Sequence, residues 1–539
     1  MAIVISELQL PLDADESSLR ELAARAVHKP AQAIQSLRVV RMSLDARKKN
    51  NIVYNCSVLV TLDGAEEKHI LKRGFSFISP APEKKDAPPR FGDTPLVKPV
   101  VVAGLGPAGL FAAYRLTQFG YKPIVTERGK RVEERQVDVD RFFESAVLNT
   151  ESNIMFGEGG AGAFSDGKLT TRIKDARAAT VLEILKQNGA PEEILYMAKP
   201  HVGTDKLLVT LKSMREKLMA LGAELRFSTR LVDLETDESG ALTAVKVEQN
   251  GKRERIECCA CILATGQGAR DTYELLEKKH LELQPKAFAV GVRVEHPRSL
   301  IDRSQYGAFV NHPRLGAAEY ALADRYGERG VYTFCMCPGG TVIASASGEE
   351  QVVVNGMSYH ARDGENSNSA IVVQVTPQDF GFGPLDGMRF QEALERSAYR
   401  LGGDGFIAPA SRVEDFLNKS APKGFGSVRP SYLPGVKAES LYKCLPDYVA
   451  AGIAAGICAF SFKLKGFDMG DAVLTAVESR TSAPLRIVRD NSMQAPRMRG
   501  LYPAGEGAGY AGGIVSAAVD GMKAADAVME KFSVTRGIV

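Results

Sequence analysis

The chain has 539 residues, of which 45% are apolar and 25% are charged, and it carries a formal net charge of +3. This composition is ordinary for a folded protein, and the length predicts about three or four domains. So small a net charge argues against wholesale nucleic-acid binding. The eight cysteines show no metal-finger spacing, so we predict no metal site.

No apolar run in the sequence reaches the length of a membrane span. The richest candidate, residues 448–462, is too short and is followed by lysines at 463 and 465. The N-terminus shows no secretory signal, so the cysteines are interpreted as reduced thiols. We therefore expect a cytoplasmic protein that does not bind a membrane.

The N-terminal residues, 1–78, predict a small α+β unit. Residues 3–10 alternate like a strand, and Asp15 is a candidate N-cap for the helix that follows. Residues 37–44 and 52–62 also have the pattern of strands, joined by a basic turn. The order β-α-β-β predicts half of a ferredoxin-like sandwich.

The strongest motif begins at residue 98. A short apolar run at 100–102 is typical of a strand buried on both faces. Gly104, Gly106 and Gly109 follow in the spacing G-x-G-x-x-G, ahead of a predicted helix and a second short strand. A glycine turn between a strand and a helix predicts a dinucleotide site, with the diphosphate at the helix N-terminus.

Each residue type in this motif has a mechanical reason. Gly104 allows the tight turn, Gly106 lets a diphosphate approach the backbone, and Gly109 lets the helix pack closely on the sheet. Glu127 ends the second strand, where a carboxylate accepts hydrogen bonds from a ribose diol. The motif by itself leaves both NAD and FAD open.

Two further features follow this motif. Arg131 and Arg135 lie four residues apart on one predicted helix face, where they either neutralise the diphosphate or are exposed at the surface. The glycine-rich segment 157–170 predicts backbone laid against a flat ligand. Its apolar members Phe164 and Leu169 favour an ordered loop over a flexible one.

The sequence does not assign a catalytic acid or base. Five residues are candidates by type and by their position in loops, and for His201 a structural role at a helix entrance is the alternative. They are His201, Arg293, His296, Tyr359 and His360.

Cys335 and Cys337 alternate onto one face of a predicted strand. They are either a redox pair or thiol nucleophile beside a cofactor, or simply packed side chains. Same-face neighbours on a regular strand are about 6.6 Å apart, whereas a disulfide needs Cβ atoms about 3.8 Å apart. Packing is therefore the favoured interpretation.

A second glycine-rich turn lies near the C-terminus. Residues 501–514 predict a short strand and a glycine turn, followed by a long helix of small residues over 515–529. The N-terminus of such a helix stabilises negative charge on a ring carbonyl, as a reduced flavin requires.

Together these stretches resemble a known class of proteins. The segments GLGPAG, TER, GEGGAGAFSDGKL, ILATG and LYPAGEGAGYAGGI resemble two-dinucleotide-binding-domain flavoproteins of the glutathione-reductase-like superfamily. The segments KPHVGTD, FAVGVRVEHP, FCMCPGG, NGMSYHARDGENSNSA and ESRTSAPLRI are similar to a bacterial family of uncharacterised FAD-dependent dehydrogenases with an N-terminal ferredoxin-like domain. One departure is Gln267, because the family pattern GHSARD has a histidine where this chain reads GQGARD.

The resemblance implies FAD as the cofactor and assigns its contacts. The implied diphosphate residues are Gly104, Gly106, Pro107, Ala108, Gly109, Ala264, Thr265 and Gly266, with Arg135 as a further candidate. The implied ribose and adenine residues are Glu127, Arg128 and Leu231. The implied ribityl and ring residues are Gly160, Ala161, Ser165, Gly167, Lys168, Leu169, Gly505, Glu506, Gly512, Gly513 and Ile514.

The expected fold is α/β, with a Rossmann-like FAD-binding domain, an inserted α+β substrate domain and an N-terminal ferredoxin-like α+β domain. The expected boundaries are 1–78 for the N-terminal domain, 79–97 for a proline-rich linker, 98–284 and 481–539 for the FAD-binding domain, and 285–480 for the inserted domain.

The expected function is that of an FAD-dependent oxidoreductase acting on an unidentified small molecule. Only one nucleotide fingerprint is present, so NAD(P)H is expected at most as a transient electron donor. Two alternatives remain open. One is a non-catalytic flavin-binding or electron-transfer protein, and the other is a flavin-dependent tRNA-modification enzyme, which would need a basic RNA surface.

Overall fold

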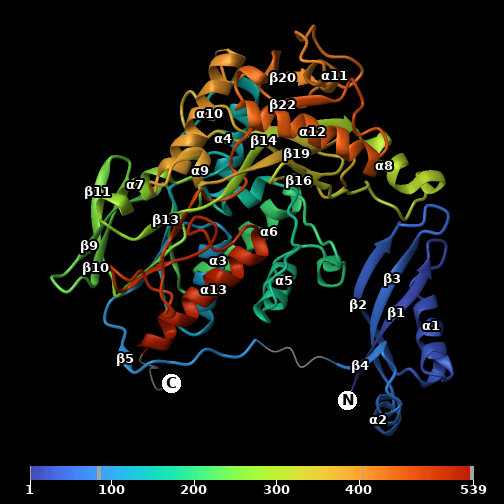
Figure 1. Ribbon diagram of the computed structural model, residues 1–539. Helices are drawn as coiled ribbons and strands as arrows, with labels where there is room; N and C mark the ends of the chain where they lie inside the picture. Colours follow the sequence, from blue (N-terminus) through green and yellow to red (C-terminus); the bar gives the residue numbers. More distant parts are fainter. Residues whose placement is uncertain (1, 82–85, 404, 535–539) are drawn as a thin grey trace.

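The computed structural model of the protein describes residues 2–81, 86–403 and 405–534. Residues 82–85 of the expected linker and 535–539 of the expected C-terminal segment lie outside the described residues. Figure 1 shows an N-terminal unit beside a larger α/β body, with residues 86–93 running below the body to β5. There β5 (Thr94–Pro95) pairs in parallel with β25 (Phe532–Ser533), so the segment ends against the C-terminal part of the chain.

The N-terminal unit is an antiparallel four-stranded sheet in the order β2-β3-β1-β4, covered by two helices. Its elements are β1 (Ile3–Pro11), α1 (Ser18–Ala26), β2 (Ser36–Asp45), β3 (Val53–Thr61), α2 (Gly64–Lys72) and β4 (Ile78–Pro80). The sequence predicted the first four of these and missed α2 and β4. The predicted N-cap was wrong, because Ser17 occupies that position. The ferredoxin-like assignment stays a prediction.

The N-terminal unit contacts the body through several segments, two of which involve its strands β2 and β3. Met42 of β2 forms a parallel bridge with Met197. The Tyr54 hydroxyl of β3 donates a hydrogen bond to the Arg314 carbonyl oxygen at 2.7 Å. These contacts hold the unit against the segments around Met197 and Arg314.

The centre of the body is a parallel five-stranded sheet in the order β24-β12-β6-β7-β8. The strands are β6 (Val100–Ala103), β7 (Ile124–Thr126), β8 (Glu224–Arg226), β12 (Ala260–Leu263) and β24 (Leu501–Pro503). The helices α3 (Pro107–Gln118) and α13 (Ile514–Lys531) pack on each other beside it. Their approach is close, because a Cβ on Gly521 would lie 1.9 Å from the Ala108 carbonyl oxygen.

A three-stranded meander and four helices complete this part of the body. The strands are β9 (Thr229–Thr236), β10 (Leu242–Gln249) and β11 (Lys252–Glu257), and the helices are α4 (Val132–Ser145), α5 (Arg177–Gln187), α6 (Thr204–Ala220) and α7 (Arg270–Lys278). The consecutive strands β11 and β12 belong to different sheets. Thr204 is the first helical residue of α6, and Gly203 is its N-cap.

The other part of the body is built on a seven-stranded sheet in the order β15-β16-β19-β14-β22-β20-β21. Its strands are β14 (Phe288–Pro297), β15 (Ala323–Tyr326), β16 (Arg329–Cys337), β19 (Asn366–Val375), β20 (Ala408–Arg412), β21 (Val436–Ala438) and β22 (Val473–Glu478). Its helices are α8 (Arg298–Tyr306), α9 (Pro377–Phe380), α10 (Asp386–Gly402), α11 (Val413–Leu417) and α12 (Asp447–Lys463).

Smaller elements join these layers. The remaining strand pairs are β13 (Leu283–Pro285) with β23 (Leu485–Ile487), and β17 (Thr341–Ala344) with β18 (Val354–Met357). The 3-10 turns are η1 (Ala31–Ala33), η2 (Gly160–Phe164), η3 (Glu192–Leu195), η4 (Gly307–Phe309) and η5 (Leu441–Lys443).

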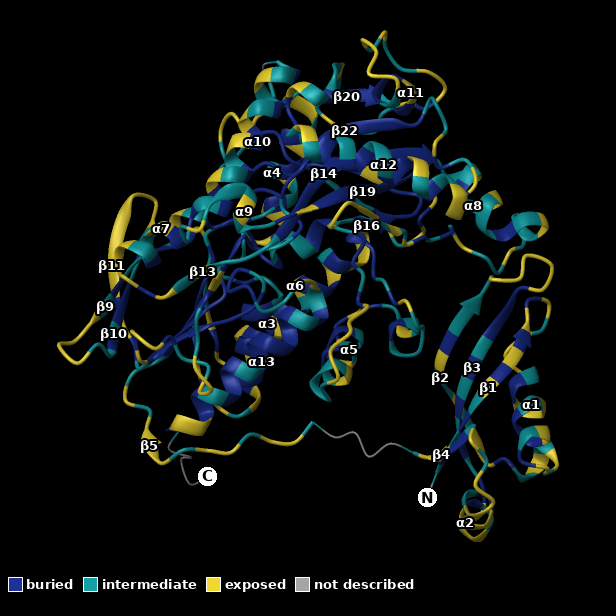
Figure 2. Cartoon of the chain, in the orientation of Figure 1, coloured by how far each residue is buried: buried dark blue, intermediate teal, exposed yellow. Residues whose placement is uncertain are grey.

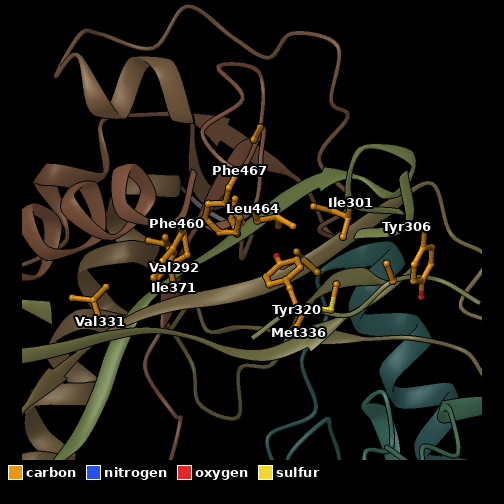
Figure 3. Close-up of a cluster of buried hydrophobic side chains, with 14 of the residues drawn as sticks. Val292, Ile301, Tyr306, Tyr320, Val331, Met336, Ile371, Phe460, Leu464 and Phe467 are labelled. Carbon is orange, nitrogen blue, oxygen red and sulfur yellow. The ribbon is translucent and has the colours of Figure 1, made fainter. Parts of the chain in front are cut away.

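The two parts of the body have dense apolar cores. Figure 3 shows one of them, where Phe460, Leu464 and Phe467 lie against Val292 and Ile371 of the seven-stranded sheet. Figure 2 shows that the central strands are buried, while exposed residues gather on the outer helices and the β9–β11 meander. Within the described ranges, no helix combines the length and the apolar character that crossing a membrane requires.

Candidate functional site

A cavity of about 390 Å³ lies where the carboxyl ends of the parallel strands face the seven-stranded sheet. Ligand cavities in proteins are typically about 300–1,000 Å³, and in open parallel sheets they lie at this edge. Most of the residues implied as cofactor contacts line it. They are Gly104, Gly106, Pro107, Ala108, Glu127, Arg128, Gly160, Ala161, Ser165, Gly167, Lys168, Leu231, Ala264, Thr265, Gly266, Glu506, Gly512, Gly513 and Ile514.

Three of the implied residues stand behind the cavity wall. A Cβ on Gly109 would lie 1.9 Å from the Gly104 carbonyl oxygen, and one on Gly505 would lie 2.6 Å from the Ala108 Cβ. Both positions therefore serve close packing of α3. Leu169 is buried, and its amide donates to the Pro200 carbonyl oxygen at 2.9 Å. None of the three is a direct wall residue of the cavity.

Arg135 departs further from the sequence interpretation. It is fully buried and lies behind the cavity wall without lining the cavity, so neither diphosphate contact nor surface exposure describes it. Its guanidinium donates to four carbonyl oxygens, those of Asn153 (2.8 Å), Ile154 (2.8 Å), Glu158 (2.7 Å) and Gly160 (3.0 Å). Burial lowers the Arg135 pKa to about 10, which leaves the side chain charged at neutral pH.

The first glycine turn leaves its backbone open to a ligand. Gly104 has φ +99°, and a Cβ there would lie 2.4 Å from the Ala264 carbonyl oxygen, so only glycine fits. A Cβ on Gly106 would come no closer than 3.7 Å to the described protein atoms. Gly106 is the N-cap of α3 and supplies no side chain to its first amides. Those amides are free to bind the diphosphate of a dinucleotide.

The other glycine segments converge on the same space. A Cβ on Gly160 would lie 3.0 Å from the Gly106 Cα, and one on Gly162 would lie 3.1 Å from the Ile514 side chain. A Cβ on Gly512 would meet none of the described atoms within 4 Å. Exposed backbone therefore surrounds the cavity from the diphosphate turn to the N-terminus of α13, which is the surface that a long, flat dinucleotide requires.

Glu127 forms part of the wall and also holds it together. Its carboxylate accepts hydrogen bonds from the amides of Leu105 (2.8 Å), Gly129 (2.9 Å) and Gly157 (2.9 Å). It thereby joins the first glycine turn to the glycine-rich segment 157–170. A carboxylate offers about four lone-pair directions, so these amides leave one for a ribose hydroxyl.

Substituting Glu127 by glutamine is expected to weaken FAD binding about 10- to 100-fold. The new amide group would face backbone N–H donors, and an unsatisfied buried donor costs about 1–3 kcal/mol. Equilibrium dialysis of FAD against the apoprotein measures the effect. Glu134→Gln, at an exposed position of α4, is the control. An FAD affinity equal to that of the control would contradict the role of the Glu127 hydrogen bonds in holding the cavity wall.

Sequence reasoning missed several polar residues of the wall. Asp166 is buried and accepts from Arg362 at 2.9 and 2.5 Å, from Ser358 at 2.8 Å and from Lys168 at 2.7 Å. Although burial alone would raise it, the cations Lys168 and Arg362 hold the Asp166 pKa well below its usual range. Asn355, Glu478 and Arg480 also line the cavity. They come from distant segments, and the sequence held no signal that brings them together.

Gln267 replaces the histidine of the family pattern and links two parts of the wall. Its Nε2 donates to Oε1 of Glu506 at 2.7 Å and to the Arg480 carbonyl oxygen at 3.0 Å. Burial raises the Glu506 pKa to about 7, against the opposing effect of Lys286. Glu506 is therefore a protonated carboxyl of the wall in mildly acidic solution.

The raised pKa of Glu506 predicts a pH dependence of stability. The folded chain keeps a proton that the unfolded chain, with a pKa of 4.5, releases. This contribution to the free energy of unfolding falls as the pH rises from about 4.5 to about 7 and is lost above that. Urea unfolding of the apoprotein across this range should show a flatter dependence for Glu506→Gln. The exposed control Glu530→Gln should keep the wild-type pH dependence. If Glu506→Gln keeps it as well, the predicted contribution of Glu506 is contradicted.

The five predicted acid–base candidates are all described, and none of them lines the cavity. The His201 ring stacks on the His360 ring at 5.1 Å, and Tyr359 is exposed. His296 is buried, which lowers its pKa to about 4, and its Nε2 contacts the Phe467 carbonyl oxygen. Arg293 is one layer behind the wall, where it holds two cavity residues, Glu478 (2.9 Å) and Asn355 (2.8 Å).

Comparison with known proteins agrees with this site. Residues 287–481 match a family model described as "FAD-dependent protein, C-terminal domain-like", and residues 2–61 match a domain of unknown function (DUF8436). With the glycine segments around one cavity, the match defines the chain as an FAD-dependent flavoprotein. It belongs to the same family as an uncharacterised protein of Clostridium beijerinckii (strain ATCC 51743 / NCIMB 8052). The two are 47% identical over 541 aligned positions, which cover 99% of this chain and 100% of the relative.

Solved structures of flavoproteins resemble the fold only distantly. A geranylgeranyl bacteriochlorophyll reductase-like protein from Thermoplasma acidophilum is 12% identical, with 80% of this chain and 78% of that chain covered and a TM-score of 0.34. A 3-ketosteroid-Δ4-(5α)-dehydrogenase from Rhodococcus jostii RHA1 is 12% identical, with 82% and 99% covered and a TM-score of 0.33. CtdE in complex with FAD is 11% identical, with 80% and 83% covered and a TM-score of 0.31.

Proposed function

We propose that the protein is an FAD-dependent oxidoreductase whose small-molecule substrate reacts at the flavin ring, between the FAD-binding part and the seven-stranded sheet. The observation that carries the proposal is the composition of the cavity wall. One side consists of open glycine backbone, and the other presents Phe334, Asn355 and Glu478 from the seven-stranded part. A flavin laid on the first side would face polar groups on the second.

When bound, FAD supplies the redox chemistry, and the chain's residues position the reactants. Arg293 is fully buried and fixes both Asn355 and Glu478 at the wall. Arg480 is fixed in turn by the buried Glu395, with Nη2 2.9 Å from Oε2. Side chains held in this way are already oriented for a substrate, so little conformational entropy is lost on binding.

The rest of the chain extends the proposal. The chain has a single nucleotide fingerprint, which is assigned to FAD. We therefore propose NAD(P)H as an electron donor that binds transiently, without a binding domain of its own. The order β-α-β-β-α-β and the antiparallel sheet support a ferredoxin-like N-terminal domain. The eight cysteines are free thiols, which supports a reducing compartment, and we place the protein in the cytoplasm.

Anaerobic photoreduction of the purified yellow protein, followed by a screen of oxidants, tests the enzyme function. We expect at least one class of small molecule to re-oxidise the flavin at a useful rate, and a reduced nicotinamide to reduce it. If no small molecule does either, the protein is an electron-transfer or flavin-binding module and the proposal fails. Strongly salt-dependent RNA binding would instead favour the tRNA-modifying alternative.

A further inference from the structure

The end of strand β16 places two thiols at the cavity. Cys335 is half-buried and lines the cavity, while Cys337 is buried behind it. The β16–β19 register shifts between Phe334 and Cys337, and Cys335 has φ +44°. The regular alternation expected from the sequence is therefore broken, and the spacing of about 6.6 Å along an ideal strand does not apply.

This bulge brings the two cysteines together. Cys337 Sγ donates to the Cys335 carbonyl oxygen at 3.3 Å, so the second side chain turns back over the first residue. A bulge is a common device for re-aiming a side chain next to an active site. Left-handed backbone at a non-glycine residue is costly and is found where function requires it. The packing interpretation accounts for neither feature.

Two cations hold this segment. Lys168 donates to the Met336 carbonyl oxygen, between the two cysteines, and Arg293 Nη1 donates to the Cys335 carbonyl oxygen at 2.9 Å. A side-chain hydrogen bond between the two thiols, together with the cations Arg293 and Lys168, lowers the pKa of Cys335 to about 5. The same side-chain hydrogen bond and burial raise the pKa of Cys337.

The acidic groups around the pair offset these cations only in part. Asp166 is shared between Lys168 and Arg362, and Glu478 is ion-paired with Arg293. Glu506, the remaining acid that interacts with Cys335, has its pKa raised to about 7 by burial. A thiolate beside a thiol is the arrangement that forms and opens disulfides.

We propose that Cys335 and Cys337 are a redox-active dithiol that exchanges an electron pair with the flavin. This deepens the proposed function, on which it rests. The step balances without another reactant. The Cys335 thiolate and the Cys337 thiol form the S–S bond and give up an electron pair and a proton. The same electron pair and proton convert oxidised FAD into its reduced anion. In the reverse direction the S–S bond opens and the thiolate and thiol return.

A reductive titration of the holoprotein tests this proposal. Anaerobic titration of the air-oxidised wild type with dithionite should consume one more electron pair per flavin than Cys335→Ser or Cys337→Ser consumes. Cys458→Ser, at an exposed position of α12, should behave as the wild type. Equal consumption by the wild type and both variants would overturn the proposal.

A second measurement needs no variant. The wild-type holoprotein is oxidised, its free thiols are alkylated, and the peptide that contains both cysteines is weighed. We expect both residues to escape alkylation and the peptide to have lost the mass of a pair of hydrogens, while both residues are alkylated after full reduction. Alkylation of both after oxidation would overturn the dithiol. A flavin that still exchanges electrons with small molecules would in that case leave the proposed function standing.

Discussion

Substituting Gly106 by glutamate is expected to give a folded protein that does not retain FAD. Gly106 has φ −71°, which any residue adopts, and a Cβ there faces the cavity with the nearest protein atom 3.7 Å away. The backbone therefore tolerates the side chain. The added carboxylate would lie against the diphosphate, and two like charges about 4 Å apart repel by about 4 kcal/mol near a protein surface. That corresponds to roughly a thousandfold loss of affinity.

Flavin absorbance per protein after gel filtration measures this loss, and circular dichroism of the two apoproteins checks that the variant folds. Gly64→Glu is the matched control, because Gly64 is exposed and a Cβ there would meet none of the described atoms within 4 Å. A Gly106→Glu protein that elutes with one flavin per chain would contradict the diphosphate assignment. The neighbours Gly104 and Gly109 are unsuitable for this test, because a Cβ at either clashes with backbone.

The glycine turns could be predicted because their meaning is local. A strand, a turn and a helix within about 30 residues fix where Gly104, Gly106 and Glu127 stand, whatever the rest of the chain does. The two later glycine segments were recognised because exposed backbone in an ordered loop has few other uses. The structure brings all three around one cavity.

The residues whose positions were predicted wrongly or missed depend on where their side chains point and on which distant segments meet, and neither follows from the local sequence pattern. Arg135 was predicted at the phosphate because it is near the turn in sequence, but α4 presents it to the loop at 153–160. Cys335 was predicted on a regular strand, and a single left-handed residue changed its environment. Asn355 and Glu478 are brought to the site by the pairing of strands far apart in the chain, which no short window of sequence contains.

The buried position of Arg135 leads to a second large expected effect. Arg135→Met keeps most of the apolar contact and removes the donors to four carbonyl oxygens of the segment 153–160. Breaking a buried charged network in this way costs about 3–5 kcal/mol. We expect the free energy of unfolding of the apoprotein to fall by that amount. Arg135→Lys should lie between, because an ammonium group offers three donors and cannot bridge the set.

Urea unfolding of the apoproteins, followed by circular dichroism, distinguishes a role of Arg135 in holding the loop at 153–160 from a role in neutralising the diphosphate. Arg131→Met, at the exposed N-cap position of the same helix, is the control and should leave stability within about 0.5 kcal/mol of the wild type. A residue that merely neutralised the diphosphate would lower FAD affinity and leave the apoprotein unchanged. Arg135 holds the loop at 153–160, which leads into the glycine-rich segment 157–170. The free energy of unfolding of the apoprotein itself should therefore fall. FAD affinity should fall as a consequence, because the backbone that would lie against the ring is no longer held in place.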